Sequence, residues 1–416
     1  MDLVSVISVL LTIAALFGYL NERYVHLPST IGLMLIALVM SLGLIVLGRF
    51  GLAPGRVVRE FLTHVDFNQA LMHGMLSFLL FAGALHVNLE DLNRNRWTVG
   101  LLATGGVIVS TALIGVAGWW LFGMLGVDLP LLYCLVFGAL ISPTDPIAVL
   151  AVLKSVGVSR DLEAKIAGES LFNDGVGVVV FVVLLGIAAE GGGVRAGDIA
   201  LLFVREALGG AVFGLGAGYL AYRMLKGVDN YSVEVLITLA LVAGGYALAD
   251  HLHLSGPIAI VVAGLLIGNH GRLLAMSSTT RAHLDSFWEL IDETLNAVLF
   301  VLIGLEVLVL TFTPRLLLAG ALMIPLVLVA RFVSVGLPVR LLGRAREFSP
   351  HAIPVLTWGG LRGGISVALA LSVPVGPERP VILAVTYIVV VFSILVQGLT
   401  VGRLARAAGG GGGASG

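Results

Sequence analysis

Two carboxylates, an amide and a hydroxyl lie close together within an apolar stretch of the chain. Glu169, Ser170, Asn173 and Asp174 all belong to residues 168–175, which read Gly-Glu-Ser-Leu-Phe-Asn-Asp-Gly. On a helix, positions four apart share a face, so the four side chains would fall within an arc of about 140°. A charge at the centre of a bilayer costs at least about 2.5 kcal/mol, so ionisable groups in a spanning segment indicate a functional site. We therefore expect one functional polar face on this helix.

An interrupted segment precedes this face. Residues 142–146 read Ser-Pro-Thr-Asp-Pro. Pro143 and Pro146 lack backbone donors and disfavour helix at the residues before them, so the chain should unwind around Thr144 and Asp145. Carbonyls freed at membrane depth are tolerated only against protein or a polar cavity, where they are ready ligands for a small hard cation. Oxygen-only ligands select alkali or alkaline-earth ions. The candidate site residues are Asp174, Glu169, Ser170, Thr144, Asp145 and Asn173.

The same carboxylates can bind protons. Desolvation favours the neutral form of a carboxyl group, and two carboxylates that share a site cannot both stay ionised cheaply. Cation and proton therefore compete for the site. If the site must hold one or the other before it changes sides, exchange of cation for proton follows without another coupling device. Asn173 cannot titrate, so it can hold Asp145 or Asp174 by a hydrogen bond without adding a charge.

Three further charged residues lie within apolar stretches, and each has a structural alternative to a functional role. Arg362, in the Gly-Leu-Arg-Gly segment 360–363, can offset the negative ends of broken helices and pair with a carboxylate. Arg331 is similar, and Glu169 is a candidate partner for either arginine. We favour a structural ion pair for both arginines. Glu306 can line the ion pathway or serve a structural or interfacial role.

The composition places these residues in a membrane protein. Of 416 residues, 58% are hydrophobic and only 12% are charged, with a mean hydropathy of +1.05, whereas soluble domains carry about 25% charged residues. The formal net charge of -1 gives no reason to expect nucleic-acid binding. The single cysteine, Cys134, excludes a disulfide framework and a thiolate metal cluster. We find no nucleophile–base pair and no catalytic metal set, so we do not expect an enzyme.

Apolar windows long enough to cross the hydrocarbon layer predict about thirteen spans. They lie near 2–20, 29–48, 69–87, 98–125, 130–153, 164–189, 200–224, 233–250, 255–270, 287–311, 315–341, 350–373 and 380–402. We expect the first to be a retained span. Lysines and arginines concentrate in alternate loops, beginning with the first, which predicts an N-terminus outside and a C-terminus in the cytoplasm. Gly210, Gly214 and Gly218 recur every four residues, which indicates close helix packing.

The fifth and the twelfth spans are both interrupted. The fifth contains residues 142–146, and the twelfth contains residues 358–364, which read Trp-Gly-Gly-Leu-Arg-Gly-Gly. With a seventh span as a link, these positions match between two groups of six spans in inverted orientation. Matching interruptions in inverted repeats are typical of the midplane binding sites of secondary transporters.

Three motifs in this order, at 142–146, 168–175 and 360–363, resemble those of the monovalent cation/proton antiporter family, the bacterial NhaP type and its eukaryotic relatives. The resemblance implies an all-α membrane protein with two inverted six-helix repeats, crossed discontinuous helices and a homodimeric assembly. It also implies that the Asn173–Asp174 pair belongs to the electroneutral branch, with one cation per proton. The implied ligands are Asp174, Glu169, Ser170 and the Thr144 carbonyl, with Asp145 and Asn173 in support and Glu169 tied to an arginine.

The resemblance also gives a domain division. Residues 1–402 would form a single transmembrane unit. The core domain would lie roughly at 98–189 and 315–402, the dimerisation domain roughly at 1–87 and 233–311, the linking helix at 200–224, and a short disordered cytoplasmic tail at 403–416. On this division the core moves while the dimer interface stays still.

We therefore expect a sodium/proton antiporter of the cytoplasmic membrane that accepts lithium, works by alternating access and serves sodium export and pH homeostasis. It needs no cofactor, and its partners are sodium ions, protons, membrane lipid and a second copy of the chain. One alternative is a potassium/proton antiporter on the same scaffold, because cavity size and ligand field set selectivity. A less favoured alternative of another class is a cation channel or a transport-dead sensor.

Overall fold

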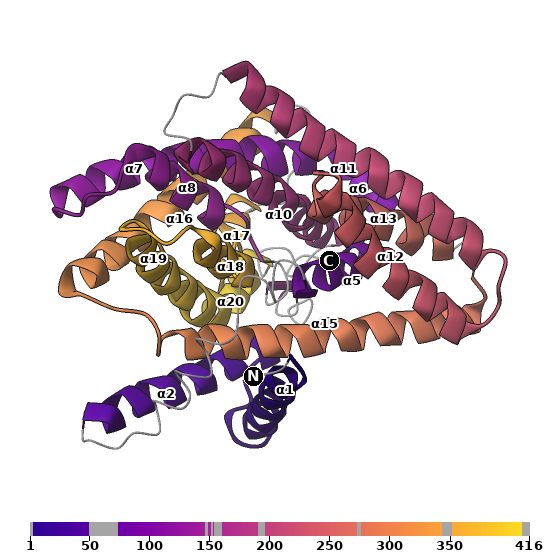
Figure 1. Ribbon diagram of the computed structural model, residues 1–416, viewed down its shortest axis with the longest axis horizontal. Helices are drawn as coiled ribbons and strands as arrows, with labels where there is room; N and C mark the ends of the chain where they lie inside the picture. Colours follow the sequence, from indigo (N-terminus) through magenta and orange to yellow (C-terminus); the bar gives the residue numbers. More distant parts are fainter. Residues whose placement is uncertain are drawn as a thin grey trace, which may run out of the picture.

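The computed structural model describes residues 3–49, 74–145, 149–150, 153, 160–189, 196–272, 276–342 and 352–409. These residues are mostly helical, and the extended pairing found among them is an isolated antiparallel bridge between Asp145 and Leu361. A helix satisfies its backbone hydrogen bonds internally, which lipid cannot do for it, so an apolar chain of this kind folds into helices. The predicted all-α class is confirmed (Figure 1).

The helices follow one another along the whole described chain. They are α1 (Leu3–Leu20), α2 (Ser29–Arg49), α5 (Leu76–His86), α6 (Leu89–Leu101), α7 (Val107–Met124), α8 (Leu131–Ile141), α10 (Arg160–Ala189), α11 (Ala196–Leu225), α12 (Tyr231–His251), α13 (Gly256–Leu266), α15 (Ser278–Glu306), α16 (Pro314–Leu342), α17 (Ala352–Trp358), α18 (Gly364–Ser372), α19 (Arg379–Phe392) and α20 (Gly398–Gly409). Short π-helical segments extend α1 and α13 and join α6 to α7 and α19 to α20.

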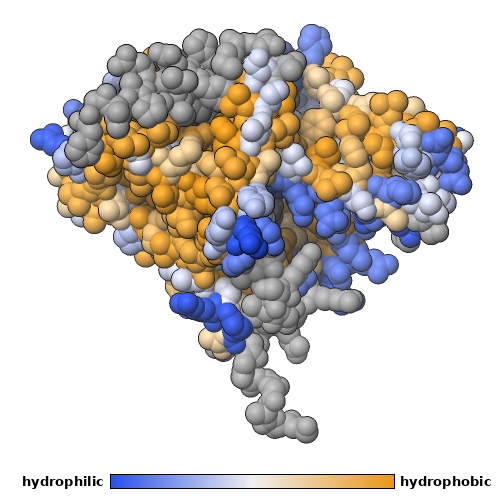
Figure 2. Space-filling view, turned by 90° about the horizontal axis from the view of Figure 1, so that it is seen from below, coloured by the Kyte–Doolittle hydropathy of each residue, from blue (hydrophilic) through white to orange (hydrophobic). Residues whose placement is uncertain are grey.

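Apolar helices dominate the surface as well as the interior. Seven helical stretches of the described residues are long and apolar enough to cross a membrane, and α5, α8 and α13 are shorter apolar helices. Hydrophobic residues form broad areas of the described surface seen in Figure 2, as contact with lipid requires. The number of about thirteen spans stays a prediction.

Several predicted boundaries differ from the structure. The fourth predicted span begins with α6 at Leu89 instead of near 98. Helix α15 begins at Ser278 instead of near 287, and the Ser277 hydroxyl caps it by accepting the Thr280 N–H at 3.3 Å. Helix α20 continues to Gly409, so residues 403–409 are helical although we expected a disordered tail from 403. The physical reason is packing, since Ala405 is buried in the same apolar cluster as α17. Residues 410–416 lie outside the described ranges.

The spaced glycines of α11 let this helix approach α13 closely. A Cβ at Gly210 would lie 2.7 Å from the Ser255 carbonyl oxygen, and one at Gly218 would lie 3.1 Å from Ala263 Cα. Larger side chains would therefore separate the two backbones. The helix packing predicted from the four-residue spacing is confirmed, and Figure 1 shows α11 running along the edge of the molecule beside α12 and α13.

Both predicted interruptions are present, and they meet. Helix α8 ends at Ile141 and residues 142–145 are not helical, while α17 ends at Trp358 and α18 begins at Gly364. The Asp145 N–H donates a hydrogen bond to the Leu361 carbonyl at 2.8 Å. The two unwound segments therefore pass beside one another, which confirms the crossed discontinuous helices. Pro146, the last residue of the first motif, lies outside the described ranges.

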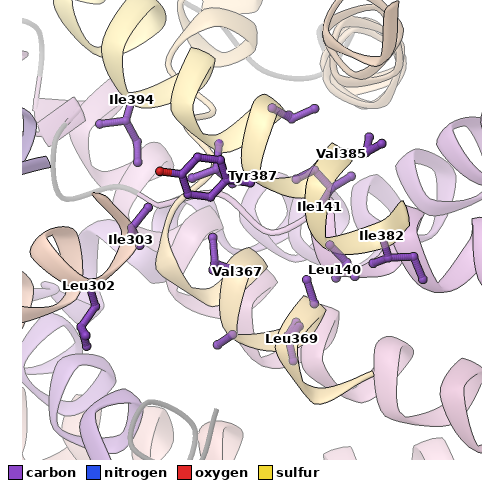
Figure 3. Close-up of a cluster of buried hydrophobic side chains, with 14 of the residues drawn as sticks. Leu140, Ile141, Leu302, Ile303, Val367, Leu369, Ile382, Val385, Tyr387 and Ile394 are labelled. Atoms are coloured by element: carbon purple, nitrogen blue, oxygen red, sulfur yellow. The ribbon is translucent and has the colours of Figure 1, made fainter. Parts of the chain in front are cut away.

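An apolar core holds the broken helices in place. Figure 3 shows side chains from α8, α15, α18, α19 and the segment that follows α19 gathered in one cluster. Its labelled members are Leu140, Ile141, Leu302, Ile303, Val367, Leu369, Ile382, Val385, Tyr387 and Ile394. The half-helices α8 and α18 are short, so burial against these neighbours, more than their own hydrogen bonding, stabilises them.

Candidate functional site

Asn173 joins helix α10 to the unwound segment after α8. Its Oδ1 accepts the Thr144 N–H at 3.2 Å, and its Nδ2 donates to Thr144 Oγ1 at 2.9 Å. Ser170 Oγ lies 3.0 Å from the same Thr144 hydroxyl, and all three residues are buried. Because a buried backbone donor needs a partner, Asn173 supplies the one that the broken helix no longer provides. We expected the Asn173 amide to bind Asp145 or Asp174, but in the structure it binds Thr144.

Asp145 lies where the second broken helix passes the first. Its backbone pairs with Leu361, and a Cβ placed on Gly363 would lie 2.9 Å from Asp145 Cγ. A Cβ on Gly360 would lie 3.2 Å from Thr144 Cγ2. The glycines of the third motif, 360–363, therefore let the first motif, 142–146, pack against them at close range.

Asp174 stands at the edge of an open space. Its side chain is buried, with 6% of the residue exposed, and together with Asp145 it lines a cavity of about 840 Å³. Gly363, the N-cap of α18, and Ser366 in its first turn also line the cavity. A carboxylate at the end of an open cavity can exchange a bound ion or proton with solvent.

Acidic groups predominate among the charged residues that line this cavity. Besides Asp145 and Asp174, the lining includes Asp91, Glu163, Glu289, Asp292 and Glu293. Walls of one sign of charge focus the electric field and raise the local concentration of counter-ions. The cavity is therefore suited to cations.

Glu169 is bound by Arg331. Arg331 Nη1 donates to Glu169 Oε1 at 2.5 Å and Nη2 donates to Oε2 at 2.9 Å, while Nη2 also reaches the Leu356 carbonyl at 3.3 Å. Glu169 is 1% exposed and Arg331 is 5% exposed. Breaking a buried pair by removing one partner costs about 3–5 kcal/mol, because the other charge is left uncompensated. Of the two arginines that the sequence offered, Arg331 is the ion-pair partner.

Arg362 stabilises the broken end of α8. Its Nη1 donates to the carbonyls of Ser142 and Pro143, the second at 2.8 Å, and its backbone N–H donates to Ser393 Oγ at 2.9 Å. Unpaired carbonyls give a helix C-terminus a partial negative charge, which a guanidinium offsets. Arg362 thus has the helix-end role that the sequence suggested. The ion pair with a carboxylate that we favoured for it is not found among the described residues, because its guanidinium is directed at the Ser142 and Pro143 carbonyls.

The sequence analysis did not predict that α15 lines the cavity. Glu289, Asp292, Glu293 and Asn296 of α15 all line it, although we placed the start of the tenth span within this polar stretch. Their spacing of three and four residues, which puts them on one helix face, was the available signal. Glu306, at the end of the same helix, is buried but is not among the residues that line this cavity.

Comparisons with known proteins identify the family of the chain. The model of the transmembrane sodium/hydrogen exchanger family matches residues 8–407. The chain is 51% identical over 409 residues to the Na(+)/H(+) antiporter NhaP of Pseudomonas aeruginosa, covering 97% of this chain and 96% of that protein. It is 36% identical over 388 residues to the Na(+)/H(+) antiporter NhaH of Halobacillus dabanensis, covering 91% of each.

A solved structure extends the comparison to the fold. The protein resembles the sodium proton antiporter of Methanocaldococcus jannaschii with a TM-score of 0.76 at 22% identity, over 98% of this chain and 100% of that one. This likeness shows the same helical architecture. Together with the match over nearly the whole sequence, it leads to one conclusion: the chain belongs to the sodium/hydrogen exchanger family.

Proposed function

We propose that the protein is a sodium/proton antiporter that also accepts lithium. The position of Asp174 carries this proposal: a carboxylate that is 6% exposed lies on a long apolar helix, at the edge of an acidic cavity. A cation or a proton can neutralise it, and each excludes the other. The names of the relatives from Pseudomonas aeruginosa and Halobacillus dabanensis support sodium as the cation.

The cation is cargo, and oxygen atoms around Asp174 would hold it. The proposed ligands are the Asp174 carboxylate, Ser170 Oγ and the Thr144 carbonyl, with Asp145 adding negative charge nearby. Hard oxygen donors of this kind suit an alkali ion. Asn173 supports the site by holding Thr144. Glu169 belongs to the ligand set suggested by the resemblance, but its two oxygens bind Arg331, so it acts here through that ion pair.

Charge balance favours exchange of one cation for one proton. Arg331 neutralises Glu169, and Arg362 is directed at backbone carbonyls. Asn173 adds no charge beside Asp174. With the charge of Asp145 the same in both loaded states, one positive charge is exchanged for another at Asp174, so the loaded forms with sodium and with hydrogen carry the same net charge.

Alternating access follows from the place of the cavity between two groups of helices. Leu76 and Leu80 of α5 and Leu299 of α15, in the proposed dimerisation domain, line the cavity. So do Asp174 of α10 and Ser366 of α18, in the proposed core domain. Movement of the core against the other group would close this cavity and open one on the far side.

The orientation and assembly complete the proposal. Asn88, Asp91 and Glu163 line the cavity close to the loops for which the distribution of lysine and arginine predicts a cytoplasmic location. The cavity then faces the cytoplasm, with the N-terminus outside. We further propose a homodimer in the cytoplasmic membrane, in keeping with the family resemblance.

Reconstituted transport tests the function. Purified protein in proteoliposomes with an acidic interior and a trapped pH dye should release protons when sodium or lithium is added outside. Protein-free liposomes are the control. Proton release in response to potassium but not to sodium or lithium would show a potassium/proton antiporter instead. Folded protein that moves no protons with any of the three cations would overturn the antiporter.

A further inference from the structure

Helix α15 presents a continuous polar row to the cavity. Glu289, Asp292, Glu293 and Asn296 are spaced by three and four residues and all line the cavity. Such spacing puts side chains above one another on one helix face. The row therefore forms a track along the cavity wall, and Asn296 is its last member.

Asn296 has an amide oxygen without a partner. The residue is 2% exposed, and its Nδ2 donates to the Asp292 carbonyl one turn back, at 2.8 Å. Its Oδ1 has no hydrogen-bond partner in the part of the chain that the structure describes. A buried polar atom of this kind is rare and requires an explanation, such as a bound ion or water. Because its own helix holds the NH₂ group, the oxygen is the free end of the amide.

Neighbouring contacts place Asn296 close to the crossing of the broken helices. Leu299, three residues further along α15, packs against Gly364 at the start of α18, where a Cβ would lie 2.8 Å from Leu299 Cγ. Gly363 adjoins Asp145 in the same way. The row on α15 thus ends beside the segment that carries Asp145, on the wall of the cavity that also holds Asp174.

We propose that Asn296 Oδ1 and the Asp292 carboxylate form a second cation station in the cavity, outside the Asp174 site. A neutral amide oxygen and a carboxylate are hard ligands that suit a partly hydrated alkali ion. The station would hold the cation before it reaches Asp174 and would set the apparent affinity from the side on which the cavity opens. This inference rests on the proposed antiport.

Asn296→Leu tests the station, because leucine keeps the approximate size of asparagine and removes the oxygen. The Michaelis constant for sodium on the cavity side should rise about tenfold, the effect of losing one ligand interaction. The maximal rate and the constant from the opposite side should stay within about twofold. Asn95→Leu is the matched control, since Asn95 on α6 is also buried and also donates its amide to the carbonyl one turn back, at 3.1 Å. It is not among the cavity-lining residues.

A binding measurement separates the station from the antiport. In an Asp174→Asn background, radioactive sodium should still bind weakly, and adding Asn296→Leu or Asp292→Asn should abolish that binding. Asp292→Asn is nearly isosteric and keeps the test open if Asn296→Leu does not fold. If the Michaelis constant of Asn296→Leu equals that of a transport-competent wild type, the station is overturned and the antiport is not. The Oδ1 atom would then bind only water. A loss of maximal rate alone would also overturn it, because Asn296 would then serve the moving helices.

Discussion

At the scale of single residues, the site separates the groups that hold structure from the group that exchanges its ligand. Arg331 occupies both oxygens of Glu169, and Asn173 occupies the backbone and hydroxyl of Thr144. Asp174 differs, because it is buried and yet reaches the cavity. Separating the Glu169 carboxylate from the Arg331 guanidinium would cost a large free energy, because both charges are buried. We therefore propose that exchange takes place at Asp174.

Asp174→Asn should abolish exchange while leaving a folded protein. An amide can neither take up a proton nor carry the charge that a cation neutralises. We expect proton movement driven by sodium in proteoliposomes to fall to the level of protein-free liposomes. Asp128→Asn is the control, because it makes the same chemical change at an exposed position between α7 and α8. Sodium-dependent proton movement that survives Asp174→Asn would remove Asp174 from the site.

At the scale of the elements, two interrupted helices bring the parts of the site together. Residues around Pro143 cannot continue α8, because proline removes a donor and disfavours helix before it. The second interruption depends on glycines, and Gly363 has φ -118° and ψ -155°, which other residues can also adopt. Its requirement for glycine is therefore one of space, since the Asp145 side chain occupies the region where a Cβ would lie.

Gly363→Ala should accordingly disrupt the crossing. The added methyl group overlaps Asp145, and overpacking of this kind costs about 1–3 kcal/mol. We expect a lower midpoint of thermal unfolding and a loss of transport. Gly244→Ala on α12 is the control, because a Cβ there meets nothing within 4 Å and a helical glycine changed to alanine gains about 0.5–1 kcal/mol. Equal behaviour of the two variants would contradict the close approach of Gly363 to Asp145.

The elements also show how far sequence patterns reach. Prolines and glycines predict where α8 and α17 end, and the spacing of Gly210, Gly214 and Gly218 predicts that α11 packs closely against another helix. The start of α15 was predicted too late. Its polar residues broke the apolar pattern, although they continue the helix and line a cavity. The tail prediction failed at residues 403–409 for a related reason, since small residues such as Ala405 pack where hydropathy gives little signal.

At the scale of the whole molecule, the balance of charges determines how the transporter responds to voltage. One cation exchanged for one proton moves no net charge. With wild-type proteoliposomes, an imposed membrane potential of either sign should leave the initial rate of sodium-driven proton movement unchanged. The measurement uses a potassium gradient with an ionophore, and an ionophore-free sample is the control. A rate that rises with one sign of potential would show that unequal charges cross and would contradict the exchange of one for one.

The sequence by itself determined the membrane class, the helical architecture and the two interruptions, and it indicated the residues at which we propose that a cation and a proton compete. These follow from local rules, because hydropathy, proline and glycine act on the chain within a few residues. The tertiary structure alone decided that Glu169 pairs with Arg331, that Asn173 holds Thr144 and that α15 supplies a wall of the cavity. These contacts join residues far apart in the chain, and for each residue the sequence offers several possible partners of the same chemical type. Only the packing of the helices selects among them.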